Sequence, residues 1–140
     1  MARLIAIDYG TKRTGLAVTD PLGIIASPLE TVDTKQLERY LADYFAKEDV
    51  STIVVGEPWQ PNGQPSENLQ RVRSFVELLK KNFPDKEIVL YDERFTSVIA
   101  HRTMIDAGLH KKARQDKSLV DEISATIILQ DYMESRRFHV

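Results

Sequence analysis

The sequence has 140 residues, of which 42% are hydrophobic and 29% charged, which indicates one globular domain spanning residues 1–140 and excludes a disordered chain. It contains no cysteine, so disulfide bonds and thiolate metal sites are excluded. The net charge of −2 argues against a protein that coats nucleic acid through bulk positive charge, but it permits a local basic patch. We find no signal peptide and no apolar run of about 20 residues, so we expect a cytoplasmic protein without a membrane partner.

Three strands are predicted at the beginning of the chain. Residues 4–7 form an apolar run typical of a buried strand, and residues 14–19 follow a glycine-containing turn as its hairpin partner. A third strand is expected over residues 24–31. Its Pro28 cannot donate a ladder hydrogen bond, which favours a position at the edge of the sheet. We expect these strands to form a meander.

The rest of the chain alternates predicted helices and strands. Asp33, with Gln36 three residues later, is typical of a capping box that starts a helix. The later elements are a strand within residues 51–59, a helix over 67–81, a strand and turn over 86–97, a helix from Thr96 to about Gly108, a mobile loop to Lys117 and a helix over 118–136. Because crossovers between parallel strands are right-handed, the later strands should run parallel to the first.

Acidic residues stand at the ends of the strands that we expect to be parallel. Asp8, Glu57 and Glu93 occupy these positions, and the carboxyl ends of such strands meet at the sheet edge where open α/β sheets bind ligands. Asp121 begins an inward stripe of the last helix, because residues four, seven and eleven positions later return to the same side. The pattern therefore predicts a cluster of acids at one edge of the sheet.

Clustered carboxylates repel one another unless they take up protons or share a cation. Mg²⁺ and Mn²⁺ prefer oxygen ligands, usually a few carboxylates with water and substrate phosphate. Two such ions about 3.5 to 4 Å apart can activate a water and stabilise the leaving oxygen in phosphodiester cleavage. The acids therefore indicate a site for one or two Mg²⁺ or Mn²⁺ ions.

Each acid also has a simpler structural explanation. Asp8 can be a turn residue that precedes a glycine, and Asp121 can belong to the cap of its own helix. Glu93 can form an exposed ion pair with the arginine that follows it. Glu57 stands at the entrance of a loop, where a solvated glutamate is at least as consistent with the sequence as a ligand.

Four segments together resemble the YqgF/RuvX family. They are DYGTKRTGLAVTD, VVGEP with the following NGQPSENLQRVRSF, YDERFTS and VDEISATIILQDYM, and in this order they span almost the whole chain. The resemblance implies an α/β, RNase H-like fold with a mixed five-stranded sheet, in which the first three strands are antiparallel and the next two are parallel to the first, flanked by helices. It implies a Holliday-junction-resolvase-like nuclease involved in maturing the 5′ end of 16S ribosomal RNA.

The family's catalytic and metal-binding acids correspond to Asp8, Glu93 and Asp121. In the family an apolar residue commonly stands between Gly and Pro of the second of these segments, so the GEP sequence argues against Glu57 as a ligand. The resemblance also implies a set of basic residues that would hold phosphates. They are Lys12, Arg13, Arg71, Arg73, Arg94, Lys111, Lys112 and Arg114. Each of them can also be a solvated surface charge.

Three functions remain open from the sequence. The leading hypothesis is a metal-dependent nuclease acting on structured nucleic acid, either precursor ribosomal RNA or branched DNA, with ribosomal particles as a further partner and with Arg13 and Arg94 holding the phosphate. The second is an actin-like ATPase-type nucleotide binder, although the chain has no repeat that would supply a second half. The third is a noncatalytic module of the same fold that binds nucleic acid or the ribosome. A monomer and a homodimer fit the sequence equally well.

Overall fold

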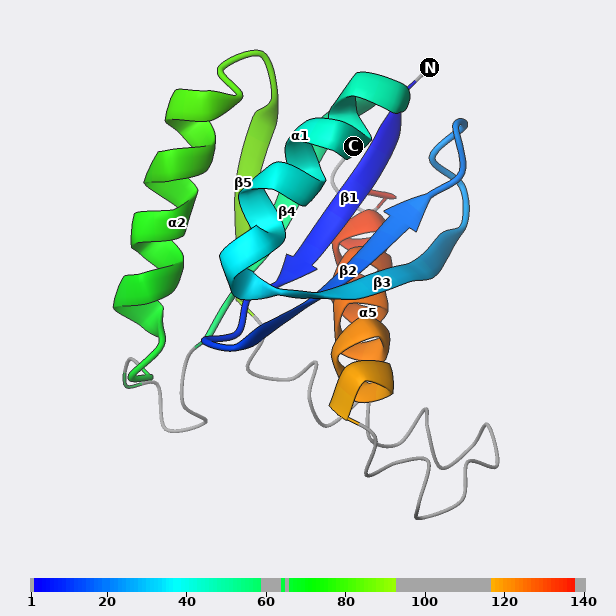
Figure 1. Ribbon diagram of the computed structural model, residues 1–140. Coiled ribbons are helices and arrows are strands. Elements are labelled where there is room, and N and C mark those ends of the chain that lie inside the picture. The colour runs from blue at the N-terminus through cyan, green and yellow to red at the C-terminus, as the bar shows by residue number, and fades with distance from the viewer. Residues whose placement is uncertain (1, 59–63, 65, 93–116, 138–140) are drawn as a thin grey trace.

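The computed structural model describes residues 2–58, 64, 66–92 and 117–137, and it contains a five-stranded sheet with helices on both faces (Figure 1). The strands are β1 (Arg3–Asp8), β2 (Arg13–Thr19), β3 (Ala26–Asp33), β4 (Val50–Glu57) and β5 (Glu87–Asp92). The helical elements are η1 (Thr34–Gln36), α1 (Leu37–Lys47), α2 (Leu69–Asn82) and α5 (Lys117–Arg137).

The sheet has the strand order β3-β2-β1-β4-β5, with β1 at its centre. β2 is antiparallel to both β1 and β3, whereas β4 is parallel to both β1 and β5. This mixed arrangement confirms the predicted sheet. β3, which carries Pro28, lies at an edge as predicted, although it begins two residues later than expected, at Ala26.

Two apolar layers hold the helices on the sheet. One face of the sheet packs against α1 and α2, and its cluster includes Ile5, Ile7, Leu16, Leu37, Leu41, Ile53, Val55, Phe75 and Leu79. The other face packs against α5 through Ala6, Ala17, Val54, Ala125, Ile128, Leu129 and Tyr132. Because successive side chains of a strand point to opposite faces, β1 and β4 contribute to both layers. Their burial on both faces explains why both strands read as nearly continuous apolar runs.

The helix starts differ from the sequence expectations. Asp33 makes no side-chain cap hydrogen bond, so the predicted capping box is wrong. The physical reason is that Asp33 still pairs with Arg13 as the last residue of β3, and the chain turns only afterwards, through the 3₁₀ turn η1. α2 begins at Leu69, two residues later than predicted, after Asn68.

α5 extends over Lys117–Arg137, close to the predicted helix over 118–136. All five residues from Ala125 to Leu129 are buried, so the middle of this helix is covered around most of its circumference. No helix in the described ranges combines the length and the apolar character that a bilayer crossing requires. The helix predicted from Thr96 to Gly108 and the loop predicted after it lie outside the described residues.

Candidate active site

Asp8 is the last residue of the central strand and stands opposite Gly15 of β2. Directly opposed residues of an antiparallel pair point to the same face of the sheet. Ala6 and Ala17 form another opposed pair on that face, and both pack against α5. The register therefore directs the Asp8 side chain toward the α5 side, at the carboxyl end of β1.

Gly15 is the point at which α5 reaches the sheet. A β-carbon at this position would collide with the backbone carbonyl of Asp121 and would lie 2.9 Å from the Asp121 Cβ. Glycine is therefore required for this close approach of helix and strand. Asp8 lies opposite Gly15 in the ladder and Asp121 lies against it from the helix, so the two acids are brought to the same place from distant parts of the sequence.

Arg13 balances part of this negative charge. Its Nε lies 3.4 Å from Asp121 Oδ2, within reach of charge attraction but without the alignment of a hydrogen bond. Both side chains are partly exposed, so the pair contributes little to stability. A guanidinium carries five N–H donors, and Arg13 can therefore engage Asp121 at one of them and offer others to a phosphate.

The turn between β1 and β2 is braced from the end of β3. A β-carbon on Gly10 would collide with the Arg13 carbonyl, so this tight turn also requires glycine. The Thr34 hydroxyl donates to the Gly10 carbonyl over 2.7 Å, and the Thr34 backbone N–H donates to the Lys12 carbonyl over 3.0 Å. These bonds hold Lys12 and Arg13 beside the acidic edge. Thr34 was not predicted from the sequence as part of the site, because nothing in the local pattern distinguishes it from any other threonine after a strand.

Glu57 ends β4 at the same edge of the sheet but on the other face. Val55, two residues earlier, packs in the layer of α1 and α2, so strand alternation places Glu57 on that side. Its partner in the parallel register is Asp92, the last residue of β5, which the sequence analysis did not identify. The sheet therefore separates Glu57 and Asp92 from the face that carries Asp8.

Tyr91 connects the end of β5 to α5. Its hydroxyl donates to Asp131 Oδ2 over 2.7 Å, and its ring packs edge-on against Tyr132 with the centroids 6.3 Å apart. Burial, together with this hydrogen bond to a carboxylate, raises the pKa of Tyr91 to about 12. Tyr91 therefore stays neutral at physiological pH and tethers the strand that leads to Glu93 to the helix that carries Asp121. This contact was not predicted from the sequence.

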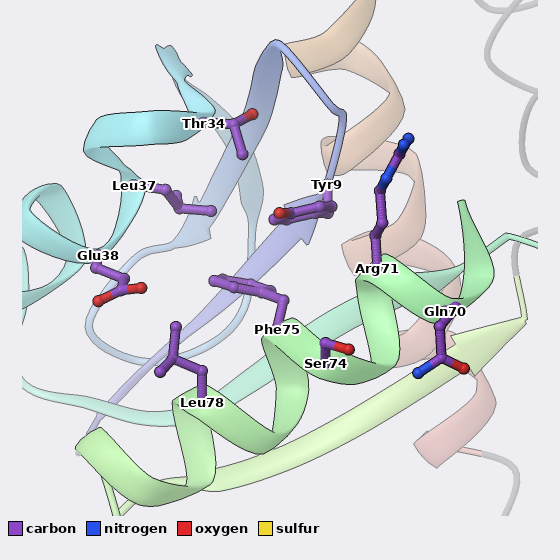
Figure 2. A pocket seen from close by; sticks show the side chains of 9 residues that line it. All are labelled: Tyr9, Thr34, Leu37, Glu38, Gln70, Arg71, Ser74, Phe75 and Leu78. Atoms are coloured by element: carbon purple, nitrogen blue, oxygen red, sulfur yellow. The ribbon is translucent and has the colours of Figure 1, made fainter. Parts of the chain in front are cut away.

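The basic residues predicted to hold phosphates fall into separate groups. Arg71 and Arg73 are both exposed on α2, but they lie on different sides of it. Arg71 rises beside Tyr9 at the rim of a pocket (Figure 2), whereas Arg73 lines a groove with Leu90 of β5. Of these two, the structure brings Arg71 toward the β1–β2 turn. Five further predicted site residues lie outside the described residues, namely Glu93, Arg94, Lys111, Lys112 and Arg114.

The donor set of the described edge suits a hard divalent cation. Asp8 and Asp121 supply carboxylate oxygens from adjoining elements, which Mg²⁺ and Mn²⁺ prefer over nitrogen or sulfur. Within the described ranges, no group of three or more Asp, Glu or His side chains is arranged around a common metal position. Two carboxylates match the ligand number of sites that are completed by water and substrate phosphate.

The chain is similar over almost its whole length to the members of one protein family. The model of the RuvX family, described as Holliday junction resolvase, matches residues 2–135. A Bacteroides thetaiotaomicron protein named "Putative pre-16S rRNA nuclease" is 57% identical over 138 residues, which are 99% of this chain and 100% of the relative. A Flavobacterium johnsoniae protein of the same name is 56% identical over 138 residues, again 99% of this chain and 100% of the relative.

A solved structure with the same architecture is T. thermophilus RuvC in complex with a Holliday junction substrate. It has a TM-score of 0.58 to this chain and 17% sequence identity, and the match covers 96% of each chain. At this identity the likeness concerns the fold alone. It confirms the RNase H-like α/β class that the sequence resemblance implied.

Proposed function

This chain belongs to the RuvX family, and from this premise we propose that it is a nuclease that hydrolyses phosphodiester bonds in structured nucleic acid. Its substrate is precursor 16S ribosomal RNA, in accord with the names of its relatives, and branched DNA is a second substrate class. The resemblance to the family places the cut at the 5′ end of the 16S sequence. The observation that carries the proposal is the meeting of Asp8 and Asp121 across Gly15.

The acids form the metal site of this nuclease. Asp8 and Asp121, completed by Glu93 from the family resemblance, hold one or two Mg²⁺ or Mn²⁺ ions. Such an ion supplies an activated water and neutralises charge on the phosphate. Glu57 is not part of this ligand set, because strand alternation puts it on the other face of the sheet. Two carboxylates around one glycine repel each other in the absence of a cation, which gives the site its affinity for one.

The basic residues orient the nucleic-acid strand that is cut. Arg13 holds Asp121 in place and presents its other N–H groups to the phosphate, where charge develops during the reaction. Lys12 stands next to it on the braced turn. Arg71 holds the backbone farther along the edge. Arg73, Arg94, Lys111, Lys112 and Arg114 remain further candidates for backbone contacts, on the strength of the resemblance.

The test is cleavage of precursor 16S ribosomal RNA and of a four-way DNA junction by highly purified protein with Mg²⁺ or Mn²⁺. Asp8→Asn should reduce cleavage at least about 100-fold, the scale on which single electrostatic catalytic groups act. Asp92→Asn is the matched control, because it removes a carboxylate from the same sheet edge on the opposite face. Its cleavage rate should equal that of the wild type.

Equal cleavage by Asp8→Asn and the wild type would refute the assignment of Asp8, and cleavage in excess EDTA would refute the metal dependence. If the wild type binds RNA but cuts no substrate under any of these conditions, the noncatalytic binding module is the correct description.

A further inference from the structure

A pocket with a volume of about 400 Å³ lies between α1 and α2, on the face of the sheet opposite α5 (Figure 2). Its apolar wall includes Tyr9, Phe75 and Leu78, and its rim includes Glu38, Arg71 and Ser74. We propose that this pocket holds an unpaired nucleobase of the strand that is cut. The inference rests on the proposed function and deepens it, because it makes the substrate class a strand with an unpaired nucleotide beside the scissile phosphate.

The wall of the pocket is a rigid aromatic surface. The rings of Tyr9 and Phe75 stack with centroids 4.7 Å apart and an interplanar angle of 28°. Phe75 is only 6% exposed and belongs to the core between the sheet and the helices, so it fixes the orientation of the more accessible Tyr9. Nucleobases of every type stack on aromatic side chains, which suits a site without sequence preference.

The pocket and the proposed metal site contain neighbouring residues of the chain. Tyr9 follows Asp8 directly; Asp8 faces α5, whereas Tyr9 packs against the layer of α1 and α2. The side-chain amide of Asn68 donates to the Tyr9 carbonyl over 3.0 Å, which ties this point to the start of α2. A nucleic-acid strand that crosses the carboxyl end of β1 therefore meets the acids on one side of the sheet and the pocket on the other.

The chemistry of the rim fits a nucleotide. Arg71 can hold the phosphate of the same nucleotide, and the carboxylate of Glu38 and the hydroxyl of Ser74 can meet the hydrogen-bonding edge of a base. The volume lies within the roughly 300–1,000 Å³ typical of sites for small organic groups. A base that is stacked and paired inside a duplex cannot enter such a pocket, which selects unpaired nucleotides.

The experiment measures binding of a labelled single-stranded RNA by fluorescence anisotropy in Mg²⁺, with every variant carrying Asp8→Asn so that the strand stays intact. Glu38→Trp fills the pocket from an exposed position of α1 and should weaken binding about 5- to 150-fold, the range expected for one stacked base. Asp43→Trp is the matched control on the same helix, with the same change in charge, and should leave the affinity unchanged.

A second set of measurements distinguishes the contribution of the base to the binding affinity from that of the phosphate. An abasic site introduced at each position in turn should weaken binding at one position, and at that position Glu38→Trp should add no further loss. Tyr9→Leu should show the same loss as the abasic strand, and Tyr9→Phe, which keeps the ring, should restore the affinity. Free adenosine monophosphate should compete only at far higher concentration than the RNA.

Unchanged binding by Glu38→Trp, together with no sensitive position in the abasic scan, would overturn this inference and leave the proposed nuclease function intact. Free nucleotide that competes as strongly as RNA would also overturn it, because the pocket would then be a mononucleotide site. Failure of the protein to bind any RNA or DNA would refute the proposed function itself.

Discussion

Replacing Gly15 by alanine should separate the two described carboxylates of the proposed metal site without removing either of them. The new β-carbon would collide with the backbone carbonyl of Asp121 and would lie 2.9 Å from the Asp121 Cβ. Because both obstacles belong to the helix at its point of contact, no side-chain rotation relieves the collision. α5 must move away from β2, and Asp121 must move with it.

The structure sets the size of the effect. Non-bonded carbon atoms are optimally about 3.5–4.0 Å apart, so the 2.9 Å approach to the Asp121 Cβ alone requires a retreat of about 0.6–1.1 Å. The carbonyl group of Asp121 would lie closer still, so this range is the minimum movement of the helix. Overpacking of this kind costs about 1–3 kcal/mol of the free energy of unfolding, which corresponds to roughly 3–12 °C in melting temperature. A misplacement of about 1 Å in a catalytic constellation costs about 100-fold in rate.

Urea unfolding and the rate of Mn²⁺-dependent RNA cleavage should be measured on the same preparation. Gly23→Ala is the control: Gly23 has a φ of +68° and open space around it, so alanine there costs about 1–2 kcal/mol through backbone strain alone. That glycine lies in the β2–β3 loop at the opposite end of the sheet, and its variant should cleave normally. If Gly15→Ala cleaves as fast as Gly23→Ala, the reasoning about the close approach of α5 is wrong.

Three further predictions concern metal binding, the hydrogen bond from Tyr91 to Asp131, and Asp20 in the loop between β2 and β3. Mn²⁺ at about 100 times its dissociation constant should stabilise the wild type by about 2.7 kcal/mol, seen as a rise in melting temperature that Asp8→Asn lacks; an equal rise in that variant would contradict the metal site. Tyr91→Phe removes the hydrogen bond to Asp131 and should lower the free energy of unfolding by about 1 kcal/mol. Because the pKa of Tyr91 is raised from 10.0 to about 12, this contribution is complete below pH 10 and is lost as the pH rises through about 12, so urea titrations at pH 6 and pH 9 should show the same deficit. Backbone hydrogen bonds, chiefly from Ile25, lower the pKa of Asp20 below 3.8, so its stabilising effect is present above that pH and is lost as the pH falls through its lower folded value. Asp20→Asn should therefore be less stable than the wild type at pH 7, and the difference should shrink in acid; a deficit that grows below pH 4 would contradict this assignment.

The sequence by itself determined the elements and the positions of the acids at their ends. The apolar run of residues 4–7 predicted a buried strand, and a second strand was predicted within residues 51–59. The structure places β1 and β4 at these positions, each between two packed layers. The spacing from Asp121 to Tyr132 predicted an inward stripe on the last helix, and Ala125, Ile128 and Tyr132 do pack against the sheet. Such features are readable because burial imposes a local period on the sequence.

Only the tertiary structure decided which of these acids come together. The ladder register and the missing side chain of Gly15 bring Asp121 beside Asp8, whereas strand alternation turns Glu57 to the opposite face. The pairing of Arg13 with Asp121 likewise depends on the helix reaching the sheet. These relations join residues that are distant in the sequence, and no local period encodes them, because they follow from how closely two backbones can pack.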